Sequence, residues 1–169
     1  TAGQSVTINC NCPTITVSGS STICQTAPAT IYTQTGGAAN GVWSVTPASA
    51  GTITATGGFT PNSTYAGAAS INYTITGCVG SLNIDINALP TINVVTNCIG
   101  GLGTGTLTTT ANPGSGGTLT YTINGTSDAD GAQTGLANGP YNVIVTETPS
   151  GCTAGQSVTI NCNCPTITV

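Results

Sequence analysis

Cysteine is the residue type in this sequence with the clearest chemistry. The chain has eight cysteines, and four of them lie in a segment that occurs twice, because residues 1–17 and 153–169 are identical. Cysteines bind zinc or form disulfides, but the chain has no histidine and no paired C-x-x-C spacing of the kind that zinc sites use. Eight cysteines in a chain that is only 2% charged therefore indicate disulfides formed in an oxidising compartment.

Four cysteines are the predicted disulfide partners within the domains: Cys24, Cys78, Cys98 and Cys152. The separation of Cys24 and Cys78 along the chain equals that of Cys98 and Cys152 (78 − 24 = 152 − 98). The equal spacing favours the pairs Cys24–Cys78 and Cys98–Cys152. Without the second copy of the repeated segment the chain has six different cysteines, and six cysteines permit other connectivities. A cross-link that closes a loop of this length would stabilise a small domain by about 4 kcal/mol in the chain-entropy model.

A second group of cysteines is closely spaced: Cys10, Cys12, Cys162 and Cys164. They lie in the two copies of one boundary motif (INCNCP at 8–13 and at 160–165), whereas the other boundary (INALP at 86–90) has none. Equivalent domains therefore fold without them. They are candidates for a covalent cross-link between neighbouring domains or chains. The alternatives are a local C-x-C loop or a second staple onto the adjacent domain.

A pair of carboxylates is the other group that could do chemistry. The run SDADG at 127–131, with Asn124 nearby, places Asp128 and Asp130 before a glycine turn, as calcium loops do. The later bidentate glutamate of an EF-hand is missing, so a solvated turn is the alternative. We expect no cofactor, and calcium at Asp128 and Asp130 is the one candidate.

The charge of the chain excludes several classes of function. It has no lysine, arginine or histidine and only four acidic residues. Nucleic acids and anionic membranes attract proteins through cations, and no apolar run approaches the roughly 18–20 residues of a membrane span. We therefore expect no nucleic-acid partner and no membrane insertion in this segment. Ser-His-Asp, Cys-His and lysine Schiff-base chemistry are excluded too, so we expect no enzyme.

Repeats define the elements that must position the cysteines. The duplicated segment gives a period of 152 residues (153 − 1), and each period divides again, because PTITV at 13–17 recurs as PTINV at 90–94. Alternating Thr, Val and Ile residues, interrupted by Gly, Asn and Pro turn signals, predict strands throughout. The predicted fold class is all-β, with tandem immunoglobulin-like antiparallel β-sandwiches, two per 152-residue repeat.

The alternation predicts the strands Ser5–Asn9, Ala29–Thr33, Val42–Thr46, Gly51–Thr56, Ser70–Thr76, Ser81–Asn87, Thr104–Thr110, Thr118–Asn124, Tyr141–Thr146 and Ser157–Asn161. Four segments follow from the repeats. Residues 1–12 are expected to be the last strand of a preceding repeat and 13–90 an immunoglobulin-like β-sandwich. Residues 91–164 are expected to form a second β-sandwich, and 165–169 the first strand of the next repeat.

Several motifs of the second half occur together in one known type of repeat. They are NCIGG at 97–101, GTGTL at 103–107, LTYTING at 119–125, TGLANGPYNVIVT at 134–146 and SGC at 150–152, with Glu147 as the acidic residue before the final Gly-Cys. By these motifs the second domain resembles the SprB-type repeats of giant surface adhesins in gliding bacteria. The first half looks like the immunoglobulin-like modules beside such repeats, with Trp43 at the position of their core tryptophan. The resemblance implies a secreted, multidomain cell-surface or extracellular filament protein.

Two functions are consistent with these observations. The first is a structural segment of an extracellular filament or adhesin stalk, whose partner is itself, through head-to-tail repeats or neighbouring subunits, including by strand addition. The alternative is an extracellular module that binds glycan or ice through exposed threonine rows or tyrosines. The rows are Thr14/Thr16, Thr52/Thr54/Thr56, Thr74/Thr76, Thr104/Thr106/Thr108 and Thr118/Thr120/Thr122. Trp43 and Tyr141 are expected to pack inside rather than to hold a ligand.

Overall fold

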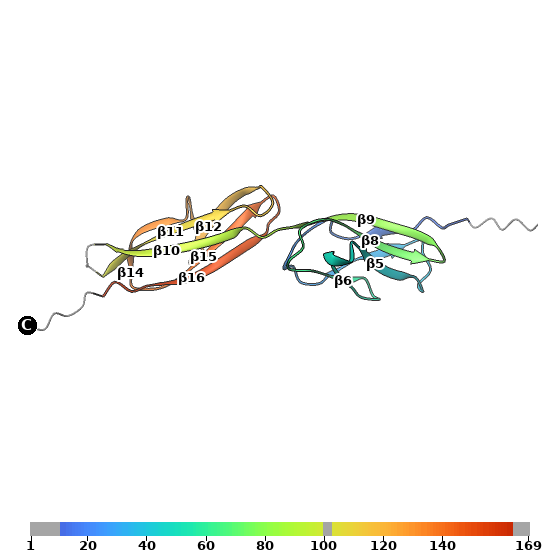
Figure 1. Cartoon of the computed structure of the whole chain (residues 1–169), viewed down its shortest axis with the longest axis horizontal. Helices are drawn as coiled ribbons and strands as arrows, with labels where there is room; N and C mark the ends of the chain where they lie inside the picture. The colour runs from blue at the N-terminus through green and yellow to red at the C-terminus, as the bar shows by residue number, and fades with distance from the viewer. Residues whose placement is uncertain (1–10, 100–102, 164–169) are drawn as a thin grey trace, which may run out of the picture.

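The computed structural model describes residues 11–99 and 103–163, which form two β-sandwich domains that lie end to end (Figure 1). The short linker at 88–90 joins them. The first strands begin at one end of the molecule, and the last strand ends at the opposite end, so the described chain is elongated (Figure 1). Within the described residues, no helix is long and apolar enough to cross a membrane.

The first domain is built mainly from short strands. Within residues 11–90 they are β1 (Thr16–Ser18), β2 (Thr22–Cys24), β3 (Thr30–Ile31), β4 (Thr33–Thr35), β5 (Val42–Thr46), β6 (Gly51–Ile53), β7 (Gly58–Pro61), β8 (Gly67–Ile75) and β9 (Cys78–Asn87), with a 3-10 turn at Ala48–Ala50. A four-stranded sheet, in the order β2-β9-β8-β5, packs against the two smaller sheets β1-β4 and β3-β7-β6. The strand pairs are antiparallel except for β2, which runs parallel to β9. The all-β fold class is confirmed, and this parallel pair is an exception to the expected antiparallel pairing. It arises because β1 and β2 follow each other along the length of the domain and belong to different sheets.

The second domain has longer strands. In residues 91–99 and 103–163 they are β10 (Thr91–Ile99), β11 (Thr104–Asn112), β12 (Thr118–Ile123), β13 (Thr126–Asp128), β14 (Ala132–Ala137), β15 (Gly139–Thr148) and β16 (Thr153–Ile160). They form the sheets β10-β11-β14 and β13-β12-β15-β16, all antiparallel.

The strand β16 lies in the second copy of the repeated segment. It pairs with β15 from Thr153 opposite Thr146 to Ile160 opposite Gly139. The predicted strand Ser157–Asn161 in the second domain is therefore present, and it begins earlier, at Thr153. The expected strands at 1–12 and 165–169, Ser5–Asn9 among them, fall almost wholly outside the described residues.

Most of the other predicted strands are present, and β5 has the predicted bounds. Two differ. The predicted strand Ala29–Thr33 is divided into β3 and β4, because Tyr32 between them turns inward and its N–H donates to the Gly57 carbonyl (2.9 Å). The predicted strand Gly51–Thr56 ends at Ile53, because the Thr54 hydroxyl accepts a hydrogen bond from the Gly58 N–H (2.9 Å) and closes a turn.

The two cores differ in kind. In the first domain, Tyr32 and Phe59 are fully buried and meet edge to face, with ring centroids 6.3 Å apart. Trp43 is half-buried and packs on Tyr73, 4.8 Å between centroids, which confirms its packing role. The core of the second domain is smaller and aliphatic. Its main buried cluster in the described residues is Val94, Leu107, Ile123 and Val143, and Val145 and Ile160 are buried as well.

We expect Tyr32→Phe to lower the free energy of unfolding of the first domain by about 1 kcal/mol at neutral pH. The phenol O–H donates to the Ser20 carbonyl (2.8 Å), and burial raises the pKa of Tyr32 above its ordinary value of 10.0. The folded state thus favours the neutral phenol. The stabilisation that the neutral Tyr32 phenol contributes is complete below pH 10, and it is lost as the pH rises through the pKa of Tyr32 in the folded protein. Urea unfolding followed by Trp43 fluorescence at neutral and alkaline pH should show a smaller alkaline loss for Tyr32→Phe than for the wild type. An equal loss in both would contradict this assignment.

Candidate functional site: the covalent domain junction

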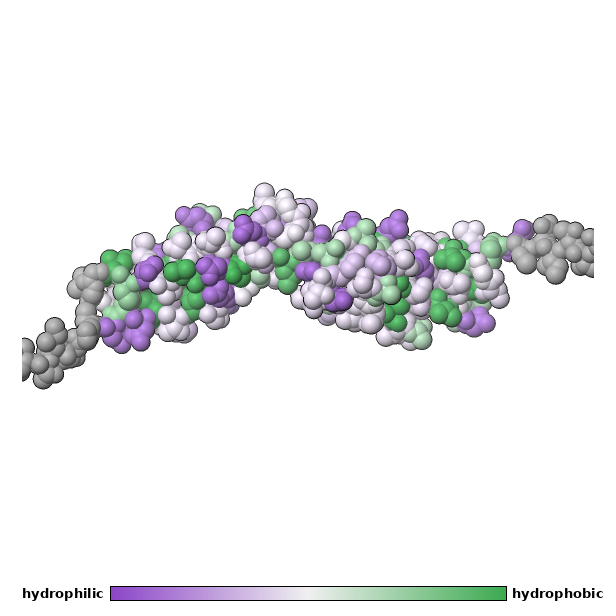
Figure 2. Space-filling view, in the orientation of Figure 1, coloured by the Kyte–Doolittle hydropathy of each residue, from purple (hydrophilic) through white to green (hydrophobic). Residues whose placement is uncertain are grey.

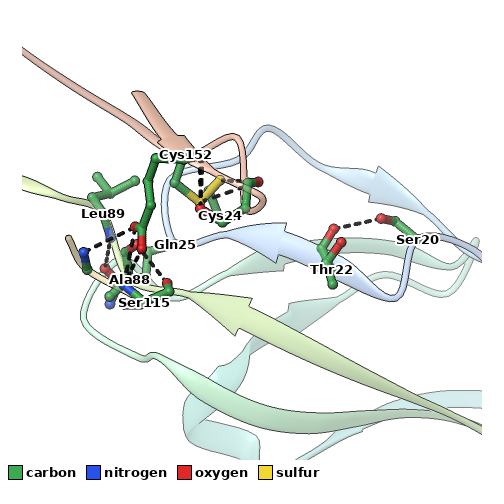
Figure 3. Close-up of a disulfide and its surroundings, with 11 residues drawn as sticks. Ser20, Thr22, Cys24, Gln25, Ala88, Leu89, Ser115 and Cys152 are labelled. Carbon is green, nitrogen blue, oxygen red and sulfur yellow. Dashed lines mark hydrogen bonds between the residues drawn. A yellow bond between two sulfur atoms is a disulfide. The ribbon is translucent and has the colours of Figure 1, made fainter. Parts of the chain in front are cut away.

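A disulfide between Cys24 and Cys152 joins the two domains beside the backbone linker (Figure 3). Cys24 is the last residue of β2, and its neighbour in the sheet is Asn87, the last residue of β9. The strand β2 therefore ends where the linker begins. Cys152 follows the turn after β15 and is fully buried. Their Cα atoms are 5.6 Å apart, a separation typical of disulfides.

The pairing that we predicted from spacing is wrong. Cys24, Cys78, Cys98 and Cys152 are all in disulfides, but Cys78 bonds Cys12, and Cys98 bonds Cys162. The physical reason is position along the domain. Cys78 is the first residue of β9, directly after the turn that follows β8 at the outer end of the first domain, whereas Cys24 lies at the junction. The second domain repeats this arrangement in reverse, because Cys152 is at the junction and Cys98 is near the outer end of β10.

The closely spaced cysteines staple the outer ends of the domains. Cys12 is bonded within the first domain and Cys162 within the second, with Cα separations of 5.4 Å in both bonds. The backbone N–H of Cys162 also donates to Asn138 Oδ1 (2.7 Å). The bond of Cys12 is the predicted alternative of a staple onto the adjacent domain, whereas the bond of Cys162 lies within the predicted domain 91–164. Cys10 and Cys164 lie outside the described residues.

Glu147 fixes the second domain's side of the junction. It stands on β15 behind Val143 and Val145, on the face that points inward, and it is fully buried. Its carboxylate accepts hydrogen bonds from three backbone N–H groups of the loop after β11: Gly114 (3.1 Å), Ser115 (2.9 Å) and Gly117 (2.7 Å). A buried carboxylate is stable only where such donors surround it. The loop is therefore held in one conformation.

This loop contacts the linker, and the linker contacts the first domain (Figure 3). The Ser115 hydroxyl donates to the Ala88 carbonyl at 3.4 Å. On the other side, the Leu89 N–H donates to Gln25 Oε1 at 3.2 Å, one residue beyond the disulfide cysteine of β2. The Gln25 N–H donates to the Asn87 carbonyl at 3.0 Å. Carboxylate, loop, linker and β2 thus form one chain of contacts beside the disulfide.

The sequence analysis did not identify Glu147 as the residue that holds this loop, although the sequence contains one signal for it. Strict alternation places Val143, Val145 and Glu147 on the same face of β15, and the two valines mark that face as the core. An acidic residue at a core position, in a chain with no cation to pair with it, indicates a carboxylate bound by backbone N–H groups. The cross-junction disulfide had no comparable local signal.

We expect Gly114→Ala to destabilise the junction by about 1–3 kcal/mol. A Cβ at this position would overlap the carbonyl oxygens of Ala88 and Leu89, which are backbone atoms of the linker. Relief would require the loop or the linker to move. Gly155→Ala on β16 is a matched control, because its Cβ would meet nothing closer than 3.4 Å. Thermal unfolding should show a lower melting temperature for Gly114→Ala alone, and equal temperatures in the two variants would be contrary to this expectation.

The two predicted calcium residues lie close together, Asp128 at the end of β13 and Asp130 in the turn that leads to β14. Asp128 Oδ1 accepts the Gly131 N–H (2.6 Å) and Oδ2 accepts Gln133 Nε2 (3.0 Å), while Asp130 Oδ1 accepts the Ala132 N–H (3.0 Å). The Gln133 amide, assisted by backbone N–H groups, holds the pKa of Asp128 below its ordinary value. Within the described ranges, no group of three or more His, Cys, Asp or Glu side chains could hold a metal. Both aspartate carboxylates therefore accept hydrogen bonds from residues of the same turn.

Most of the aromatic residues pack against one of the two cores. All five tyrosines and Trp43 lie in the described residues, and none of them is exposed. The Tyr141 hydroxyl donates to the Ala137 carbonyl (3.1 Å) of its own domain. A concavity of about 420 Å³ beside β2, β8 and β9 is lined by Ser, Thr, Ala, Asn and Ile residues and Asp85, without an aromatic side chain. The threonine rows, in contrast, reach the surface. On the outer face of β10 and β11, Thr110 stands opposite Asn93 and Thr108 opposite Val95.

No family model and no curated protein matches this chain. Solved structures with some similarity include extracellular domains 3–5 of Drosophila OTK, at 11% identity and a TM-score of 0.43, covering 85% of this chain and 60% of that one. Domains 4 and 5 of the S-layer protein SbsC have 12% identity and a TM-score of 0.39, with 88% of this chain and 96% of that one covered. This chain thus spans less than two thirds of the OTK structure. Similarities at this level carry no functional argument, and the fold assignment depends on the strand pairing described above.

Proposed function

We propose that this chain is a segment of an extracellular filament or adhesin stalk, in which disulfide-braced β-sandwiches are strung end to end and perform no catalysis. The disulfide across the domain junction is the observation that carries this proposal. A covalent bond between neighbouring domains, added to the linker, restricts their bending and twisting. A module that only presents a binding site has no need of such a bond.

Three features of the described chain support the proposal. Its three disulfides are typical of proteins that fold in an oxidising environment such as the cell exterior. The two domains lie along one axis, with the start and the end of the described chain at opposite ends (Figure 1). Because β16 belongs to the duplicated segment, a further repeat that begins at Pro165 would continue the molecule directly from the outer end of the second domain.

The surface suits side-by-side contact of such filaments. Figure 2 shows that much of the visible face of both domains has intermediate hydropathy, with small hydrophilic and hydrophobic patches. Of the four acidic residues in the sequence, Glu147 is buried, which leaves Asp85, Asp128 and Asp130 to charge the surface. Like-charge repulsion between neighbouring chains is correspondingly weak. The threonine face of β10 and β11 could serve this packing, and binding of glycan or ice on that face is the second candidate function.

Labelling of cells that produce the protein tests the proposal. An antibody against the folded two-domain chain, coupled to gold, is applied to intact and to permeabilised cells and viewed by electron microscopy. We expect gold particles along thin filaments outside intact cells, and no labelling of cells that lack the gene. Labelling that appears only after permeabilisation would overturn the proposal. Filament labelling that is lost with added free glycan would instead favour the second candidate.

A further inference from the structure

The three disulfides lie at three places along the molecule. Cys12–Cys78 is at the outer end of the first domain, Cys24–Cys152 is at the junction, and Cys98–Cys162 is at the outer end of the second domain. The backbone between Cys12 and Cys162 passes through every strand of both domains. Disulfides offer much shorter covalent connections between the same two residues.

One connection uses the junction disulfide. It follows the backbone from Cys12 through β1 and β2 to Cys24, crosses to Cys152, and follows β16 to Cys162. This first route contains only the backbone segments 12–24 and 152–162, and it bypasses everything between Cys24 and Cys152.

A second connection uses the two end disulfides. It crosses from Cys12 to Cys78, follows β9, the linker and β10 to Cys98, and crosses to Cys162. This second route contains only the backbone segment 78–98 and does not include the junction disulfide. The two routes run in the same direction as neighbours. In the first domain β2 is paired in parallel with β9, and in the second a side chain of β16, Gln156, accepts the Val94 N–H of β10 (3.0 Å).

The backbone of either route can be extended only a little further. The second route consists almost wholly of β9 and β10, and the first consists of β16 and of a segment about half of which lies in β1 and β2. In a strand the backbone already rises about 3.3 Å per residue against a limit of about 3.6 Å. Fully stretched, a route of roughly 20 residues spans roughly 70–80 Å. Tension on the ends of the molecule therefore reaches covalent bonds almost at once, and the rest of both sandwiches lies outside the path of the force.

We propose that the disulfides create two parallel covalent load-bearing routes, so that the two-domain segment does not lengthen under tension even when its sandwiches unfold. The biological use of this property depends on the proposed stalk function, but the property belongs to the chain itself. The routes are redundant. Opening Cys24–Cys152 leaves the second route intact, and opening either end disulfide leaves the first intact. Lengthening requires the loss of Cys24–Cys152 together with one of the other two bonds.

Single-molecule stretching of the chain from its two ends tests the proposal. All variants carry Cys10→Ser and Cys164→Ser, so that only the six described disulfide cysteines remain, and peptide mapping verifies the bonds left in each. The parent, the Cys24→Ala/Cys152→Ala variant and the Cys12→Ala/Cys78→Ala variant should each gain only on the order of 10 Å between Cys12 and Cys162. Combining the four alanines leaves the whole backbone from Cys12 to Cys98 in the path of the force and should add about 200 Å. Full reduction should add about 400 Å.

One variant discriminates most sharply. If the bonds were Cys24–Cys78 and Cys98–Cys152, Cys24→Ala/Cys152→Ala would break both and lengthen the chain by about 400 Å. A gain of that size, or of about 200 Å in either two-residue variant, would overturn the proposal. The Cys12→Ala/Cys78→Ala variant keeps the test decisive if the junction variant folds poorly. Stretching is measured on the isolated chain and labelling on cells, so failure of this proposal and failure of the filament proposal are distinguishable.

Discussion

Replacing Glu147 by alanine should lower the free energy of unfolding of the second domain by about 3–5 kcal/mol. The carboxylate is fully buried and accepts hydrogen bonds from the backbone N–H groups of Gly114, Ser115 and Gly117. Without it, each buried donor loses its partner, at a cost of about 1–3 kcal/mol apiece. The loop can recover part of this by opening to water, but it then loses its contact with the linker.

Chemical unfolding followed by circular dichroism measures the loss, and amide hydrogen exchange locates it. The three loop amides should exchange slowly in the wild type and fast in Glu147→Ala. In Glu147→Gln the exchange rates should lie between those of the wild type and Glu147→Ala. The glutamine carbonyl oxygen still accepts a hydrogen bond, but its NH2 group faces other donors. Asp85→Ala removes an exposed carboxylate of the first domain and should change stability by less than about 0.5 kcal/mol. If Glu147→Ala were as mild as Asp85→Ala, the carboxylate would not hold the loop.

Removing Cys98–Cys162 should leave the second domain close to unfolded at 37 °C. The bonded residues are 64 positions apart, so the chain-entropy model assigns the bond about 4 kcal/mol. A domain of this size gains only about 3–5 kcal/mol from its core, and the core here is a small aliphatic cluster. In Cys98→Ala/Cys162→Ala, circular dichroism should lose the signal of the second domain, while Trp43 fluorescence of the first domain stays native.

The Cys12→Ala/Cys78→Ala variant is the matched control. Its bond spans a similar separation of 66 residues, so the loss should again be about 4 kcal/mol. The first domain should nevertheless remain folded, because Tyr32, Phe59 and Ile71 are fully buried in a larger core. Unfolding of the first domain in this variant, with a stable second domain in the other, would reverse the expected order and contradict the comparison of the two cores.

Local patterns in the sequence predicted much of the fold. Alternation of β-branched residues gave β5 with its observed bounds and located β8, β9, β11, β12, β15 and β16. This works because a strand with one buried face must alternate. It fails at Tyr32 and Thr54, where a single side chain interrupts pairing through contacts that the alternation pattern does not encode.

The disulfide pairing could not be predicted from spacing, for a reason specific to repeats. Cys24 and Cys98 occupy equivalent positions in the two halves, and so do Cys78 and Cys152. Duplication alone makes their separations equal, whatever the bonds are. The pairing depends instead on which ends of the domains meet, and that is a property of the end-to-end arrangement. The inward position of Glu147, in contrast, could have been predicted from the alternation of Val143, Val145 and Glu147.

Peptide mapping without reduction tests the covalent junction most directly. Trypsin has no site in a chain without lysine and arginine, so pepsin at acid pH, which also suppresses disulfide exchange, is the suitable protease. We predict one linked species that joins the peptide of Cys24 to the peptide of Cys152 and separates into the two on reduction. A species that joins Cys24 to Cys78 would contradict the braced junction and, with it, both load-bearing routes.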